Sequence, residues 1–166
     1  IPLPACIGRV CPHPCEDACR RGLVDEPISI AMIKRFAGDM DIAAEERFIP
    51  DMEEDTGKTV AIIGGGPMGL SAAYFLRQRG HEVTIFDSMP KLGGMLRYGI
   101  PEYRLPKEVL DAEIAIMEAM GIQIVPNTKV GVDIPLDTIR NDFDAVVLGI
   151  GAWLSTGVGC PGEDAD

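Results

Sequence analysis

The chain has 166 residues, of which 46% are apolar and 25% are charged. This composition is typical of one globular domain with room for a small appendage and excludes a disordered chain. The formal net charge of −11, with the basic residues scattered, disfavours nucleic-acid binding. No apolar run reaches the roughly 18 residues of a membrane helix, and the first residues lack a secretory signal pattern. We therefore expect a cytoplasmic protein that binds neither nucleic acid nor membranes.

Residues 1–22 are rich in proline, cysteine and arginine and show no sustained hydrophobic period. We predict a loop-dominated segment that is held by something other than a hydrophobic core. Three of the five cysteines, Cys11, Cys15 and Cys19, follow one another at intervals of four in "CPHPCEDAC". In a reducing compartment, clustered thiols bind metal or carry out redox chemistry more often than they form disulfides.

The cysteine spacing favours iron–sulfur ligation over zinc, because zinc sites prefer C-x-x-C pairs with a distant second pair. A disulfide-bearing loop is the structural alternative. A cubane cluster takes four protein ligands, whereas the sequence offers three at good spacing. His13 is interpreted as a loop residue and Cys160 as structural or incidental, and Cys6 is as consistent with a small buried thiol as with a ligand.

A helix is predicted after Pro27, where "ISIAMIKRFAGDMDIA" repeats apolar residues at helical spacing. Its apolar positions are Ile30, Ile33, Phe36, Ala37 and Met40. The acidic stretch "EERFIPDMEEDTGK" that follows is interpreted as a linker. We therefore expect a cysteine-rich segment over residues 1–56 and a second domain over residues 57–166.

The second domain alternates strands with helices. We predict strands at 59–64 and 82–87, a helix at 67–80, a helix in "PKEVLDAEIAIMEAMG", and further strands in "IQIV" and "FDAVVLGIGA". The inner face of the second helix is expected to carry Val109, Leu110, Ile114, Met117 and Met120. This alternation predicts an α/β domain of Rossmann-like type with a mainly parallel sheet.

A glycine turn lies between the first strand and the first helix of this domain. In "AIIGGGPMGLSAA" the glycines follow the pattern Gly64-x-Gly66-x-x-Gly69, which permits a tight turn, backbone approach to a diphosphate and close helix packing. The helix N-terminus favours the negative diphosphate. Asp87 ends the next strand, where its carboxylate is placed to accept hydrogen bonds from an adenosine ribose. The pattern predicts binding of NAD or FAD and disfavours NADP at this site.

The stretch "KLGGMLRYGIPEYRLP" follows the second strand and carries Gly93, Gly94 and Gly99. Its place beyond a strand end favours a loop that wraps a cofactor larger than a nicotinamide dinucleotide. The alternative is a flexible surface loop.

Taken together, "LPACIGRVCPHPCEDACRRG", "DEPISIAMIKRFAGD", the glycine-turn region and the final "PGED" resemble the small subunit of NADPH-dependent glutamate synthase and its relatives. These relatives include the N-terminal half of dihydropyrimidine dehydrogenase and the flavin subunit of ferredoxin:NADP transhydrogenases. The resemblance implies electron transfer from NADPH through FAD to 4Fe-4S clusters and on to a partner subunit or domain. It assigns the chemistry to the flavin, and we identify no catalytic acid–base residue.

The resemblance also implies roles for particular residues. The FAD diphosphate would contact Gly64, Gly65, Gly66, Pro67, Met68 and Gly69, and Asp87 would bind the ribose. The diphosphate and flavin side would be lined by Lys91, Leu92, Gly93, Gly94, Met95, Leu96, Arg104 and Leu105. Val130 would hold the adenine through its backbone, and Cys11, Cys15 and Cys19 would be cluster ligands. A second glycine-bearing FAD segment would consist of Gly149, Ile150, Gly151 and Ala152.

The sequence departs from these relatives in three respects. They carry a further cysteine group before this point and an NADPH-binding domain after it, so we expect a piece of a longer protein with an incomplete ligand set. Some have a glutamine ligand where this chain has Lys34, which cannot ligate while protonated. Two alternatives remain, an NAD-dependent dehydrogenase with a structural metal and a non-catalytic scaffold piece.

Overall fold

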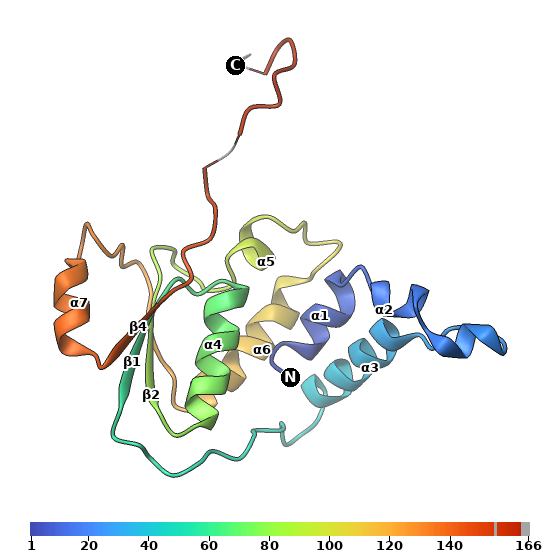
Figure 1. The fold of residues 1–166 in the computed structure, drawn as a ribbon, viewed down its shortest axis with the longest axis horizontal. Helices are drawn as coiled ribbons and strands as arrows, with labels where there is room; N and C mark the ends of the chain where they lie inside the picture. Colours follow the sequence, from blue (N-terminus) through green and yellow to red (C-terminus); the bar gives the residue numbers. More distant parts are fainter. Residues whose placement is uncertain (155, 164–166) are drawn as a thin grey trace.

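The computed structural model describes residues 1–154 and 156–163 (Figure 1). A parallel sheet lies at the centre of the second domain, with helices on both of its faces, and the N-terminal helices pack beside helix α6 (Figure 1). No helix within these residues is long and apolar enough to cross a membrane.

The sheet has four strands in the order β3-β2-β1-β4, all parallel: β1 (Thr59–Ile63), β2 (Glu82–Phe86), β3 (Gln123–Val125) and β4 (Ala145–Leu148). The predicted α/β class with a parallel sheet is therefore confirmed. The strand order reverses direction between β1 and β4, and such a switch point leaves a crevice at the carboxyl ends of the strands.

Helices α4 (Pro67–Gln78) and α6 (Lys107–Ala119) cover one face of the sheet, and α7 (Leu136–Asp142) covers the other (Figure 1). The predicted inner face of α6 is confirmed, since Leu110, Ile114 and Met117 are buried in the main core together with Met120. A smaller core of Ala61, Phe86 and Ile139 lies under α7. Helix α7 was not predicted from the sequence.

The N-terminal segment contains α1 (Pro4–Val10), α2 (Pro14–Asp17), the 3-10 helix η1 (Arg20–Leu23) and α3 (Ile30–Ile42). The expectation of a loop without a core is wrong for α1. Leu3 and Cys6 are buried in the same core as Leu110 of α6. Proline is tolerated at the start of α1, and the buried carboxylate of Glu113 accepts hydrogen bonds from its first turn.

Helix α3 forms where it was predicted, but its apolar face points outward. Ile33, Phe36 and Met40 are exposed, Phe36 by 67%. The buried side is made of small residues instead, because a Cβ on Gly38 would lie 2.5 Å from the backbone nitrogen of Ala5. The close contact between α1 and α3 is therefore what orients the helix.

The linker between α3 and β1 runs along the end of α4 rather than free of the domain. The backbone N–H of Glu53 donates to the carbonyl of Gln78 at 2.8 Å, and that of Thr56 donates to the carbonyl of Gly80 at 3.1 Å. After β2, the chain forms a glycine-bearing loop that contains the short helix α5 (Met95–Tyr98).

Candidate functional site

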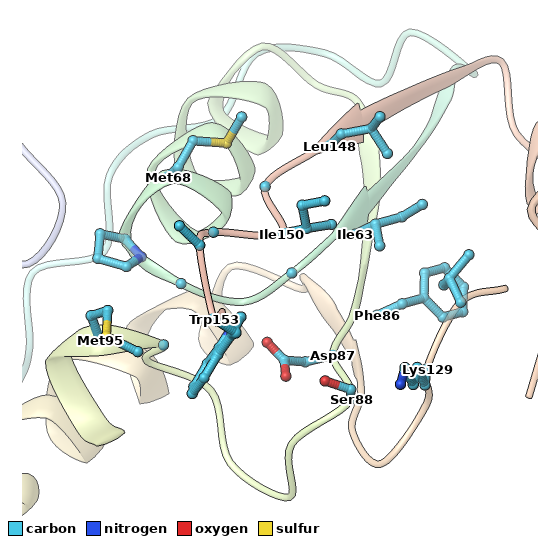
Figure 2. A pocket seen from close by; sticks show the side chains of 18 of the residues that line it. Ile63, Met68, Phe86, Asp87, Ser88, Met95, Lys129, Leu148, Ile150 and Trp153 are labelled. Atoms are coloured by element: carbon cyan, nitrogen blue, oxygen red, sulfur yellow. The ribbon is translucent and has the colours of Figure 1, made fainter. Parts of the chain in front are cut away.

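A cavity of about 610 Å³ opens at the carboxyl ends of β1, β2 and β4 (Figure 2). Ile63, Phe86 and Leu148 form its floor where the strands end. The glycine turn, the loop after β2 and the chain after β4 form its walls. Its volume lies in the usual range for small-molecule and cofactor sites, and its position is the one expected for a doubly wound sheet.

The three glycines of the turn meet different requirements. Gly64 has φ +105°, and a Cβ there would lie 2.3 Å from the carbonyl oxygen of Gly149. A Cβ on Gly69 would lie 1.9 Å from the carbonyl oxygen of Gly64. The nearest atom to a Cβ on Gly66 would be 3.8 Å away, so the fold itself has room for one. Gly66 lines the cavity, and its missing side chain leaves the start of α4 open to a ligand.

Asp87 is buried just beyond β2 and connects two parts of the cavity wall. One carboxylate oxygen accepts the backbone N–H of Gly65 at 2.6 Å, and the other accepts that of Met89 at 2.8 Å. Each oxygen keeps a further lone pair. The carboxylate can therefore hold the turn in place and still accept hydroxyl groups of a ribose.

The loop after β2 is packed against the glycine turn. The N–H of Gly93 donates to the carbonyl of Gly65 at 2.8 Å. Gly94 has φ +50°, and a Cβ there would lie 2.8 Å from the Cα of Gly66. Lys107 fixes the far end of the loop by donating to the carbonyls of Leu96 at 3.0 Å and Ile100 at 2.6 Å. These contacts hold the loop on the domain and contradict the alternative of a flexible surface loop.

The predicted cofactor residues fall into two groups. Those that line the cavity are Gly64, Gly66, Pro67, Met68, Asp87, Gly94, Met95, Val130, Gly151 and Ala152. Those that do not line it are Gly65, Gly69, Lys91, Leu92, Gly93, Leu96, Arg104 and Leu105. Within the second group, Leu92, Leu96 and Leu105 are core residues that hold the loop on the domain.

Several residues of the cavity wall were not predicted from the sequence, namely Ile63, Phe86, Ser88, Thr128, Lys129, Leu148 and Trp153. Ile63, Phe86 and Leu148 lie within the predicted strands and are the last residues of β1, β2 and β4. The carboxyl ends of parallel strands are where a doubly wound sheet places its ligand, so these positions could have been selected from the sequence. Trp153 follows the second glycine segment, in which Gly151 has φ +67°, and lines the cavity together with that segment.

The cysteines lie in different environments. Cys11 ends α1, Cys15 is in α2, and Cys19 precedes η1. Hydrogen bonds from the backbone at Ile28 and Arg21 lower the pKa of Cys19, which favours the thiolate that ligates metal. Cys6 is fully buried, and this burial raises the pKa of its thiol.

The thiols do not meet in one place. Over residues 1–154 and 156–163, no three His, Cys, Asp or Glu side chains come close enough together to hold a metal ion. The ligand set of a four-ligand cluster is therefore not completed by the described part of the chain. Cys6 matches the interpretation as a small structural thiol.

Two protein families match parts of the chain. Residues 1–48 match the family described as dihydropyrimidine dehydrogenase domain II, 4Fe-4S cluster. Residues 62–124 match the family described as NAD(P)-binding Rossmann-like domain. The two matches fall in the two parts into which the sequence was divided.

Nearly the whole chain aligns with curated oxidoreductase subunits. Over 98% of its length it is 45% identical to the NADP(+)-dependent formate dehydrogenase subunit beta of Moorella thermoacetica. Over 99% of its length it is 42% identical to the glutamate synthase [NADPH] small chain of Escherichia coli. This chain is a homologue of these subunits. The homologous stretch spans 26% of the first relative and 35% of the second.

This chain also shares its fold with a solved structure, that of Mycobacterium tuberculosis FprA in complex with NADPH. The TM-score is 0.57 at 23% sequence identity, covering 64% of this chain and 25% of FprA. The likeness supports the Rossmann-like architecture of the second domain.

Proposed function

We propose that the chain is an electron-transfer module of an FAD-dependent NAD(P)H oxidoreductase. In this proposal electrons pass from NAD(P)H through FAD to 4Fe-4S clusters and on to a partner subunit or domain. The observation that carries it is the cavity at the sheet switch point, where the glycine turn, Asp87 and the packed loop converge. The homology to NADPH-dependent subunits and the 4Fe-4S family match support the same reading.

The cavity residues fit FAD. Bound FAD would supply a hydride acceptor that also donates single electrons. The open backbone at Gly66 and the start of α4 would hold its diphosphate, and Asp87 would accept the ribose hydroxyl groups. Val130 would contact the adenine through its backbone. The protein thus binds and orients the cofactor, and we assign no acid–base step to a side chain.

For the N-terminal part we propose a role in cluster binding. Residues 1–56 would form the cysteine-bearing domain and residues 57–166 the FAD domain. Cys11, Cys15 and Cys19 would ligate iron together with further ligands from outside the described residues, since these three are not gathered into a site. Free thiols of this kind suit a reducing compartment, and we therefore propose a cytoplasmic location.

Ligand binding to the full chain distinguishes this proposal from a nicotinamide site. We expect FAD to bind saturably at one molecule per chain in equilibrium dialysis, and NAD and NADP to bind at least tenfold more weakly. ADP should compete with FAD, because it carries the same adenosine diphosphate half. Preferential binding of NAD would contradict the proposal and favour the dehydrogenase alternative. Failure of all three to bind would favour a non-catalytic scaffold piece.

A further inference from the structure

The chain's only tryptophan, Trp153, lies in the wall of the cavity. It follows the glycine segment after β4 and is 51% exposed. In Figure 2 the indole ring lies between Met95 and Asp87. A large aromatic ring that is half open beside a cavity is available to contact a ligand there.

Contacts with the loop hold the indole on the α5 side of the cavity. The ring centroids of Tyr98 and Trp153 are 5.9 Å apart, with an angle of 57° between the planes. The Tyr98 hydroxyl donates to the carbonyl of Lys91 at 2.9 Å, which fixes the tyrosine to the loop. Gly151 has φ +67°, and a Cβ added there would lie 3.7 Å from the indole nitrogen of Trp153. The loop that packs on the glycine turn therefore also positions Trp153.

The placement of Trp153 relative to Asp87 indicates which half of a dinucleotide it faces. Lys129 neighbours Val130, the residue proposed to contact adenine, and lies on the opposite side of Asp87 from Trp153 (Figure 2). The two ring systems of a dinucleotide are joined through its diphosphate. With the adenine beside Val130, as proposed above, the second ring system would lie toward Trp153 and Met95.

We propose that Trp153 is a binding residue for the flavin, with its indole stacking on the isoalloxazine ring of FAD. The inference rests on the proposed function, because it takes FAD as the ligand. Stacking on an indole suits a flat, extended ring system. The contact is expected to change the affinity for FAD by about tenfold.

The test measures the dissociation constants of FAD and ADP for the full chain by equilibrium dialysis. Trp153→Leu keeps an apolar side chain but removes the ring, and Trp153→Phe keeps a ring. Leu154→Ala is the matched control, because Leu154 is the next residue and is 95% exposed. We expect Trp153→Leu to weaken FAD binding about tenfold and to leave ADP binding within twofold of the unaltered chain. Trp153→Phe should recover most of the FAD affinity, and Leu154→Ala should change neither constant.

Other results overturn the inference. An unchanged FAD affinity in Trp153→Leu would exclude the stacking contact while leaving FAD binding intact. Equal weakening of FAD and ADP would show that Trp153 acts on the adenosine half or on the fold. No FAD binding by the unaltered chain would overturn both this inference and the proposed function.

Discussion

The carboxylate of Glu113 accepts a hydrogen bond from the backbone N–H of Cys6 at 2.9 Å, across 107 residues of sequence. The other carboxylate oxygen accepts the N–H of Ala5 at 2.7 Å. A side chain of α6 therefore caps α1, a helix whose own N-cap residue, Leu3, makes no side-chain hydrogen bond. This buried contact joins the cysteine-bearing segment to the Rossmann-like domain.

Glu113→Ala is expected to destabilise the chain by about 2–4 kcal/mol, because two buried N–H groups lose their acceptor and a cavity remains. Urea denaturation followed by circular dichroism measures this loss. Glu118→Ala, at an exposed position of the same helix, is the control and should stay within about 0.5 kcal/mol. Equal effects of the two changes would show that the cap does not stabilise the fold.

The pH dependence of stability should carry the signature of the same carboxyl. Burial raises the pKa of Glu113 above its ordinary value of 4.5, and the hydrogen bonds from Cys6 and Ala5 offset only part of that rise. The folded state therefore holds this proton more tightly than the unfolded state does. The protonated Glu113 carboxyl therefore contributes fully to the free energy of unfolding below pH 4.5. This contribution is lost as the pH rises through the raised pKa.

Glu113→Gln removes that titration. As the pH rises above 4.5, the free energy of unfolding of the unaltered chain should therefore fall relative to that of Glu113→Gln. Urea titrations at a series of pH values measure it. A difference that stays constant with pH would contradict a raised pKa at Glu113.

Thiol reactivity should separate Cys6 from the other cysteines. Cys15 and Cys160 are exposed, whereas Cys6 is fully buried with a raised pKa. In native protein, iodoacetamide followed by mass spectrometry should label Cys15 and Cys160 and leave Cys6 unlabelled. Cys6 should become labelled in urea. Native labelling of Cys6 at the rate of Cys15 would be inconsistent with its place in the core.

The orientation of α3 predicts an unusual pair of mutational effects. Phe36→Ala should change the free energy of unfolding by less than about 0.5 kcal/mol, since the ring is exposed. Gly38→Ala should cost about 1–3 kcal/mol, because its Cβ would collide with the backbone of Ala5. Urea denaturation of both variants checks the prediction. The reverse order of effects would mean that the aromatic face packs inward.

Elements with a strong local pattern were predictable from the sequence. The strands around the glycine turn are short β-branched runs, and α6 repeats Leu110, Ile114 and Met117 at helical spacing. The turn itself was recognisable from its glycine spacing, and two of its glycines, Gly64 and Gly69, have a steric reason in the fold. Local signals of this kind gave the Rossmann-like class and much of the cavity wall.

Elements that depend on distant contacts were not predictable in the same way. Helix α1 is stabilised by Glu113 of α6 and by the small residues of α3, neither of which is near in sequence. The apolar pattern of α3 gave the helix but not its orientation, because close packing at Gly38 outweighs burial of Phe36. Trp153 reaches the cavity through the path of the chain after β4, for which no hydrophobic period exists.

Gly66→Ala tests whether the glycine turn holds the diphosphate of FAD. The added methyl group has room in the fold, so stability should change by no more than about 1 kcal/mol. The control is Gly69→Ala, which should unfold at a clearly lower temperature because its Cβ would lie 1.9 Å from the Gly64 carbonyl oxygen.

The decisive quantity is the dissociation constant of FAD for the unaltered chain and for Gly66→Ala, measured by equilibrium dialysis with thermal unfolding in parallel. We predict that Gly66→Ala retains its unfolding temperature and binds FAD at least tenfold more weakly, because the methyl group occupies the path of the diphosphate. Equal FAD affinity in the two proteins would show that the diphosphate does not lie against Gly66.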